Sequence, residues 1–377
     1  MKHPTTLITS SIAFAIPTKT SSFLTAHHRS LALAAKTVMG SFESSPPNDD
    51  VSAAALKIAD LDLSISKIEK FAHRKGDALF GYIEECQVNS SPNACFGNFL
   101  DAGTGSHSLR WIASIIHRER LLAKNGGAPS STSLAPLVSL KSFTAITADE
   151  TMRLRVSKEA KELGIDNSNI IIGNWNEGVK VNNNGGVEFT SKDTLNGNNK
   201  SALLEGQTFD TILADYLVGA IDGFSPYFQD QIFHRLVHHL APGGRMYIIG
   251  LQPIPDRAPG NANIFCKITK VRDACILLAN HRCYREYPLD WIERHVSRAG
   301  MRVVESRTYP IRYTHETMVR QINVGRSKLK LFPSTAMATE MGKVLDDLER
   351  ESLEVTKRQA DGRITLGFDY VVVAEKE

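Results

Sequence analysis

Residues 96–112, FGNFLDAGTGSHSLRWI, place an acidic residue and two glycines between an apolar run and a helix-like pattern. A strand is expected to end at Asp101, and Gly103 and Gly105 then allow a tight turn. A turn without Cβ atoms lets a bound cofactor approach the backbone closely. The helix expected next leaves free N–H groups at its N-terminus, and these attract a carboxylate or a phosphate. The segment therefore predicts a cofactor site built on a strand, a turn and a helix.

Two classes of cofactor use such a turn. The nicotinamide-dinucleotide fingerprint reads G-x-G-x-x-G, but Ser108 stands where its third glycine would be. Asp101 instead precedes Gly103 by two positions, which gives D-x-G-x-G. This arrangement argues against a dinucleotide-dependent oxidoreductase. A glycine turn between a strand and a helix, with no ligand at all, is the structural alternative.

The D-x-G-x-G pattern resembles the first motif of the class I S-adenosylmethionine-dependent methyltransferases. The resemblance implies that Asp101 lies near the methionine amino group of S-adenosylmethionine. It also implies that the backbone of the turn, Gly103, Thr104 and Gly105, passes beneath the cofactor. In that family a third glycine often follows, and His107 stands in its place here.

Composition sets the outer limits of the function. The chain has 377 residues, of which 42% are hydrophobic and 23% charged, as is usual for a globular protein. The net charge of +3 gives no general case for nucleic-acid binding, and no apolar run approaches the length of a membrane span. The five cysteines show neither a CxxC pair nor a zinc-ligand spacing, so no metal site is expected.

The N-terminus has a composition of its own. Residues 1–42 contain no acidic side chain and many Ser and Thr residues, a pattern typical of an organelle transit peptide. The string IAFAIP resembles the alanine–phenylalanine junction of plastid presequences in algae with secondary plastids, which favours a plastid over a mitochondrion. A disordered tail on a cytoplasmic protein is the alternative. Residues 1–50 are thus predicted as a transit peptide or tail with a linker, and residues 51–377 as one methyltransferase domain.

The elements around the turn follow a regular order. Helices are expected over 51–90, and an alternating apolar strand over 142–149 ends at Asp149. An acid in this position is the expected partner of ribose hydroxyls, with Glu150 in reserve. The next strand, NIIIG, ends before Asn174 and Trp175, which the resemblance places beside the adenine. Asn174 would bond the ring edge and Trp175 would cover the ring, although Trp175 also suits ordinary core packing.

The fourth strand, FDTILAD, ends at Asp215, and loops after such strand ends carry the sites of α/β proteins. Asp215 is predicted to hold the sulfonium side of the cofactor or to act as a base, with Tyr216 as a second catalytic candidate. Asp222 and Tyr227 follow as acceptor-binding candidates. Their alternatives are a turn at Asp222 and core packing for Tyr227.

A helix expected over 225–240 runs into Ala-Pro-Gly-Gly and then an apolar strand, which is a second resemblance to the family. Beyond residue 255, a segment dense in Arg and Tyr is a candidate acceptor pocket, with Arg282 and Tyr284 as its binding residues. A network of ion pairs between helices is the alternative. A sixth strand, a helical insertion over 314–360 and a closing strand complete the chain.

These signals predict an α/β Rossmann-like class I methyltransferase fold. Its seven-stranded sheet is expected to be mostly parallel, with an antiparallel last strand, helices on both faces and a polar insertion over 176–207. The resemblance implies an S-adenosylmethionine-dependent methyltransferase, and a small-molecule acceptor is the default because N/D-P-P-Y and Pro-Cys motifs are absent. A protein methyltransferase of the arginine type and an inactive binding or assembly protein are the alternatives. The oligomeric state is left open.

Overall fold

The computed structural model describes residues 77–90, 94–124, 138–165, 168–181, 187–189 and 202–377. The predicted transit peptide and linker, and the expected helical part before residue 77, lie outside the described residues. Within these ranges no helix is both long enough and apolar enough to cross a membrane.

In the described part of the chain, seven strands form one sheet in the order β3-β2-β1-β6-β7-β9-β8. Their bounds are β1 Asn98–Asp101, β2 Ser142–Thr147, β3 Ser168–Ile172, β6 Phe209–Asp215, β7 Leu240–Leu251, β8 Met301–Thr314 and β9 Arg363–Lys376. Strands β3, β2, β1, β6 and β7 are parallel, while β9 is antiparallel to both β7 and β8. The predicted fold class is confirmed, including the single antiparallel strand at the end of the chain.

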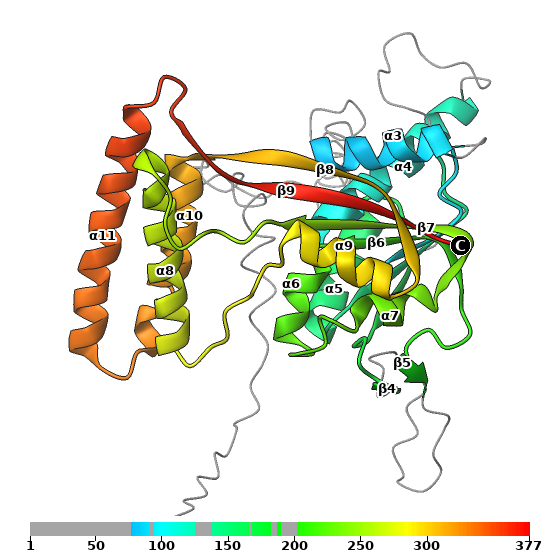
Figure 1. Cartoon of the computed structure of the whole chain (residues 1–377), viewed down its shortest axis with the longest axis horizontal. Coiled ribbons are helices and arrows are strands. Elements are labelled where there is room, and N and C mark those ends of the chain that lie inside the picture. Colours follow the sequence, from blue (N-terminus) through cyan, green and yellow to red (C-terminus); the bar gives the residue numbers. More distant parts are fainter. Residues whose placement is uncertain (1–76, 91–93, 125–137, 166–167, 182–186, 190–201) are drawn as a thin grey trace, which may run out of the picture.

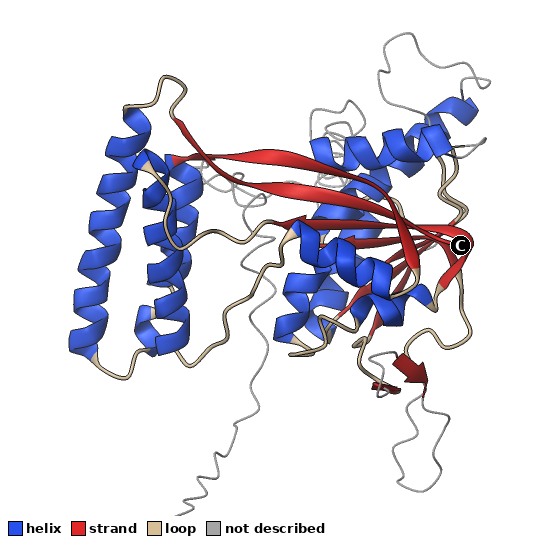
Figure 2. Ribbon diagram, viewed as in Figure 1, coloured by secondary structure: helices blue, strands red, loops and turns tan. Residues whose placement is uncertain are grey.

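Helices cover both faces of the sheet (Figures 1 and 2). One face packs against α3 (Ala78–Ser90), α4 (Ser106–Lys124) and α5 (Glu150–Glu162). The other packs against α6 (Leu217–Ala220), η1 (Ile221–Gly223), α7 (Ile232–Val237) and α9 (Leu289–Arg298). The run MYII in strand β7 is apolar on both faces, because Tyr247 and Ile249 belong to the first core and Met246 and Ile248 to the second.

Strands β8 and β9 are fourteen residues long and continue past the end of β7. Their extension carries α8 (Asn263–Leu278), α10 (His315–Arg326) and α11 (Thr335–Lys357), which we call the three-helix unit (Figure 1). The short turn η2 (Gly260–Ala262) leads into α8, and η3 (Leu329–Leu331) lies between α10 and α11. The unit has a core of its own, in which the rings of Phe265 and Tyr313 stack at 3.7 Å. Because β8 is parallel to β7 and runs into α10, the unit lies beyond the carboxyl edge of the sheet.

Two local expectations are wrong. The helix expected over 225–240 is reduced to the six residues of α7, and β7 already begins at Leu240. Ala-Pro-Gly-Gly therefore does not follow a helix but forms an irregularity inside β7, where the pairing with β6 shifts between Phe209 and Thr211. Gly243 has a φ of +70° there, which suits glycine. In the polar insertion, β4 (Val179–Val181) and β5 (Val187–Phe189) form an unexpected antiparallel pair.

Candidate functional site

A cavity lies at the carboxyl ends of β1, β2, β3 and β6, at the point where the chain order of the strands reverses. Open α/β sheets place their ligands at this point. The wall combines residues that follow these four strands with the segment after β6. It includes Ala102, Gly103, Thr104, Thr147, Ala148, Gly173, Asn174, Trp175, Asp215, Leu217, Ile221 and Phe224.

The glycine turn after β1 is one side of this cavity. The Ala102 amide donates to Leu213 of β6, and the Thr104 amide donates to Ile146 of β2, at 2.9 and 2.8 Å. The turn is thus fastened to both neighbouring strands. A Cβ on Gly103 would lie 2.8 Å from Leu217 Cδ1, so space rather than backbone conformation favours glycine at this position. Gly105 belongs to the same turn, at the start of α4, but does not line the cavity.

Two carboxylates are buried at the β1 and β6 ends of the site. Asp101 is fully buried and Asp215 is 2% exposed. Asp101 Oδ1 accepts a hydrogen bond from the Gly103 amide at 3.3 Å. Within the described ranges, neither Asp101 Oδ2 nor either carboxylate oxygen of Asp215 has a hydrogen-bond partner. Such orphaned acceptors are rare in protein interiors and indicate a missing partner.

Burial sets the charge state of both acids. It raises the pKa of Asp101 to about 6, although Ser108 and the Gly103 amide oppose the shift. It raises the pKa of Asp215 to about 7, where His107 lowers it and Asp101 raises it further. Both acids therefore have pKa values close to neutral pH. A cation that enters the cavity would lower these pKa values and favour the ionised form of both.

The acid predicted for the ribose lies elsewhere. Asp149 Oδ1 accepts from the Met152 amide at 2.8 Å and caps α5, as short acidic side chains do at helix starts. Glu150 is exposed and pairs with Arg153 on the same helix. At the end of β2, the residues that line the cavity are Thr147 and Ala148. The ribose role of Asp149 stays a prediction, and its capping contact competes with that role.

The residues predicted for the adenine do reach the cavity. Asn174 and Trp175 both line it, and Trp175 is only 4% exposed. The indole Nε1 donates to Ala102 O at 2.8 Å, and the guanidinium of Arg235 lies 5.4 Å from the ring centroid. Trp175 is thus both a core residue and a cavity wall, so the two interpretations of its sequence position do not exclude each other.

Tyr216 is turned away from the cavity. Its backbone is left-handed, with a φ of +49°, which is a strained conformation for a bulky residue. Its hydroxyl donates to Asp369 Oδ1 of β9 at 2.9 Å. Burial and the nearby Asp369 raise the pKa of the phenol well above its usual value, so Tyr216 stays neutral. Its catalytic role stays a prediction, and Asp369 is a polar neighbour that the sequence did not indicate.

The four residues predicted to bind the acceptor lie together, but none of them lines the cavity. Arg282 Nη2 pairs with Asp222 Oδ1 at 3.1 Å, and its guanidinium is 5.4 Å from the Tyr227 ring. Tyr284 packs beside the space above Gly223. The cluster fastens the loop before α9 to the segment after β6, which forms the cavity wall. Its binding of an acceptor stays a prediction.

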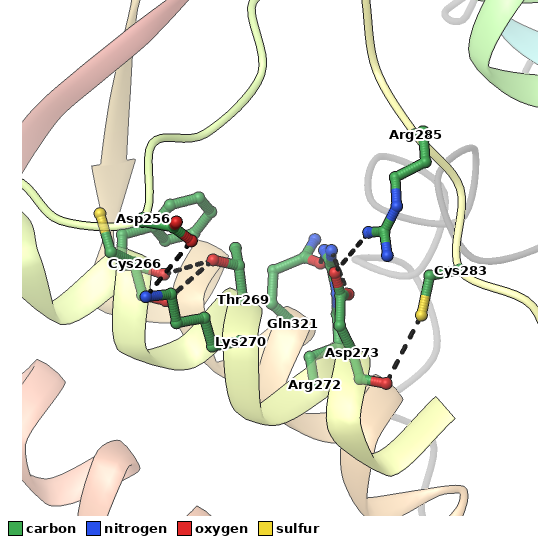
Figure 3. Close-up of polar contacts among 10 residues, drawn as sticks. Asp256, Cys266, Thr269, Lys270, Arg272, Asp273, Cys283, Arg285 and Gln321 are labelled. Atoms are coloured by element: carbon green, nitrogen blue, oxygen red, sulfur yellow. Dashed lines mark hydrogen bonds and ion pairs between the residues drawn. The ribbon is translucent and has the colours of Figure 1, made fainter. Parts of the chain in front are cut away.

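Elsewhere in the same segment, the polar side chains form a structural network (Figure 3). Arg272 donates to Asp273 Oδ1 at 2.9 Å and to Gln321 of α10 at 2.7 Å. Arg285 joins Asp273 Oδ2 from the loop at 3.4 Å. These contacts agree with the expected ion-pair alternative for this part of the segment.

Comparison with known proteins finds distant structural likenesses. No protein-family model matches the sequence, and no curated protein matches it. The YcgJ protein from Bacillus subtilis shares 14% identity over 78% of this chain and 97% of its own, with a TM-score of 0.39. A SAM-dependent methyltransferase from Geobacter sulfurreducens, solved with S-adenosyl-L-homocysteine, shares 12% over 82% and 98%, with a TM-score of 0.34. The [4+2]-cyclase SpnF shares 11% over 78% and 80%, with a TM-score of 0.35.

The strand order and the single antiparallel closing strand define this protein as one with the class I S-adenosylmethionine-dependent methyltransferase fold. No subfamily is identified. A fold of this kind does not fix the reaction, because function resides in the site. Among the residues that the structure describes, no group of three or more His, Cys, Asp or Glu side chains could hold a metal ion.

Proposed function

We propose that the protein is an S-adenosylmethionine-dependent methyltransferase that acts on a small-molecule acceptor. The proposal is supported above all by two buried acids: Asp215, which lines the cavity, and Asp101, which directly precedes the turn residues that line it. S-adenosylmethionine carries an ammonium and a sulfonium group, and so it supplies the positive charge that two orphaned carboxylates need. A dinucleotide would instead bring its anionic pyrophosphate to an already acidic cavity.

The rest of the wall fits the other parts of this cofactor. Asn174 and Trp175 offer an amide and an indole face to an adenine, and Thr147 offers a hydroxyl at the end of β2. Gly103 leaves room at the turn, because a Cβ added to this residue would clash with Leu217. When bound, S-adenosylmethionine supplies a methyl group on positive sulfur that is activated for transfer to a nucleophile. Asp215, with a pKa of about 7, can hold a proton released by an acceptor beside it.

The acceptor class rests on what the sequence lacks, because it carries none of the motifs of adenine, glutamine or cytosine-5 methylation. An arginine-type protein methyltransferase remains the first alternative. An inactive binding or assembly protein is the second, since it would keep the same cavity and lose only turnover.

The test is calorimetric titration of the full chain with S-adenosylmethionine, S-adenosylhomocysteine and NAD. We expect the first two to bind and NAD not to bind. Asp215→Asn should weaken S-adenosylmethionine binding by roughly 10- to 100-fold, because a charge-assisted contact is lost. Asp256→Asn is the matched control: its carboxylate is 94% exposed and its loss should leave the affinity unchanged.

Failure of S-adenosylmethionine to bind would overturn the proposal. Where it binds, incubation of the protein with labelled methyl donor and fractionated cell extract separates the alternatives. Label in small molecules supports the proposed acceptor class, and label only in protein supports the arginine-type alternative. Binding with no transfer to any fraction favours the inactive protein.

A further inference from the structure

One end of the three-helix unit exposes apolar side chains. Residues 274–281, at the end of α8, meet residues 326–339, which lead from α10 through η3 into α11 (Figure 1). Lys328 Nζ donates to His281 Nδ1 at 3.3 Å across this junction. Four large apolar side chains of these two segments are 36–57% exposed, namely Leu277, Leu278, Leu331 and Met337. Exposed apolar side chains that gather in one place favour a binding surface over plain solvent contact.

Charge is distributed unevenly along the same unit. The two segments contain no acidic side chain, whereas residues 340–357 of α11 contain six acids and three bases. The acids that border the segments are paired, Asp273 with Arg272 at 2.7 Å and Glu340 with Lys343 at 2.7 Å. One end of the unit is therefore basic and the rest of α11 is acidic. We call residues 274–281 and 326–339 the basic tip.

Two lysines alternate with leucines at the centre of the basic tip. Lys330 is exposed and Lys328 is half-buried, and Leu329 and Leu331 follow them in turn. Burial and the charge of Lys330 lower the pKa of Lys328. Lysine can bury its hydrocarbon stem beside apolar groups while its ammonium stays at a polar boundary. The tip thus combines positive charge and exposed apolar groups in one place.

A membrane surface that carries anionic lipids fits both features. Leucine and methionine side chains can enter the boundary between headgroups and acyl chains, and neighbouring lysines are attracted to the negative surface. The acid-rich remainder of α11 would be repelled by the same surface, so the unit would approach it with the tip first. A specific protein partner would need about 800 Å² of complementary surface, which four apolar side chains at the end of a helical unit do not supply.

We propose that the basic tip binds the surface of a membrane that contains anionic lipids. Leu277, Leu331 and Met337 then lie at the depth of the headgroups, and Lys328 and Lys330 contact the lipid phosphates. Such a peripheral contact needs no membrane-spanning helix. The inference goes beyond the proposed function and does not depend on it. A solvated charged surface that binds nothing is the competing explanation.

The test is sedimentation of the full chain with lipid vesicles. One set of vesicles is phosphatidylcholine alone, and the other contains about one-third phosphatidylserine. The tip variant combines Lys330→Gln with Leu331→Ser. The matched control combines Lys158→Gln with Leu154→Ser on α5, where these side chains are 81% and 57% exposed. Because all four side chains lie at the surface, both variants should fold, and their melting temperatures check this.

We expect the wild type to bind the anionic vesicles at least about 10-fold more tightly than the neutral ones, and to lose this binding as salt is raised. The tip variant should lose 10-fold or more of the affinity for anionic vesicles, because one lysine contributes about fivefold and one inserted leucine about 10-fold. The control should stay within about twofold of the wild type. The affinity for S-adenosylmethionine should not change in either variant.

Several outcomes would overturn the inference. Absence of binding to anionic vesicles would do so, as would equal binding to both kinds of vesicle or equal affinity of the wild type and the tip variant. Analytical ultracentrifugation gives one further outcome: a wild type that self-associates without binding vesicles, and a monomeric tip variant, would make the tip an interface between copies. Failure to bind S-adenosylmethionine would overturn the proposed function alone.

Discussion

The buried polar side chains of the cavity and those of the three-helix unit differ in whether they have hydrogen-bond partners. In the cavity wall, Asp215 is 98% buried and, within the described ranges, its carboxylate oxygens have no hydrogen-bond partner. In the three-helix unit, Ser352 and Thr356 of α11 are also buried, but Ser352 Oγ donates to Glu349 O and Thr356 Oγ1 donates to Ser352 O, each at 2.8 Å. A buried polar group without a partner costs free energy of folding, whereas a paired one costs little. This difference supports the proposal that the ligand site lies at the sheet edge and that the buried polar groups of the three-helix unit serve folding.

The first test of this difference weakens the core packing of the three-helix unit. Leu345 is fully buried in its core and lies against Gly325. Leu345→Ala should lower the free energy of unfolding by about 2–5 kcal/mol, because it leaves a cavity in a packed interior. Its affinity for S-adenosylmethionine should not change at temperatures where the protein stays folded. Urea denaturation and calorimetric titration measure the two effects.

The neighbouring Val344→Ala is the control for this change. Val344 is 42% exposed, so its truncation should cost less than about 0.5 kcal/mol. A tenfold or greater loss of cofactor affinity in folded Leu345→Ala would contradict the division of roles, since it would couple the unit to the cavity.

The second test uses pH on the ligand-free protein. Asp101 and Asp215 have folded-state pKa values of about 6 and 7, above the value of about 3.9 for an unfolded Asp. Near neutral pH the folded state therefore binds more protons than the unfolded state, and stability falls as pH rises through these values. The raised pKa of His107 acts in the same direction. Melting temperature should accordingly fall between pH 6.5 and pH 8.

The expected slope is at most about 1.4 kcal/mol per pH unit for each proton. Below pH 6.5 the lowered pKa of His239 acts in the opposite direction, which sets the lower end of the range. Saturating S-adenosylmethionine should flatten the slope, and Asp215→Asn should reduce it. A melting temperature that rises steadily from pH 6.5 to pH 8 would be inconsistent with protonatable acids in the cavity.

The succession of strands along the chain could be predicted because each strand carries its own signal. Asp101, Asp215 and the glycine turn come directly after apolar runs, and carboxyl ends of parallel strands meet at one edge. The contact of His107 with Asp77, at 2.7 Å, could not be predicted in this way, because Asp77 lies just before α3 and far from the turn in sequence. The departure of His107 from the glycine pattern was the sequence signal. Asp369 is 153 residues from Tyr216, and no motif in the sequence indicated this contact.

Local polar contacts explain the other differences. At the end of β2 the sequence places Asp149 after an apolar run, which suits both a ribose ligand and a helix cap. The distance of 2.8 Å from its carboxylate to the Met152 amide shows the cap, and it could not be derived from spacing alone. The glycines after Pro242 were expected to end a helix, but pairing with β6 drew them into β7.

The smallest expected effect decides between the two roles of Asp149. If capping is its role, Asp149→Ala should cost about 1 kcal/mol of stability, and Asp149→Ser should restore most of it because a hydroxyl also caps a helix. The affinity for S-adenosylmethionine should then stay within about threefold in both variants. If Asp149 holds the ribose, both variants should lose affinity by 10-fold or more, since a hydroxyl replaces a carboxylate poorly as a bidentate acceptor. Thermal melting and calorimetric titration of the same two variants therefore separate a cap, which Ser rescues, from a ligand, which it does not.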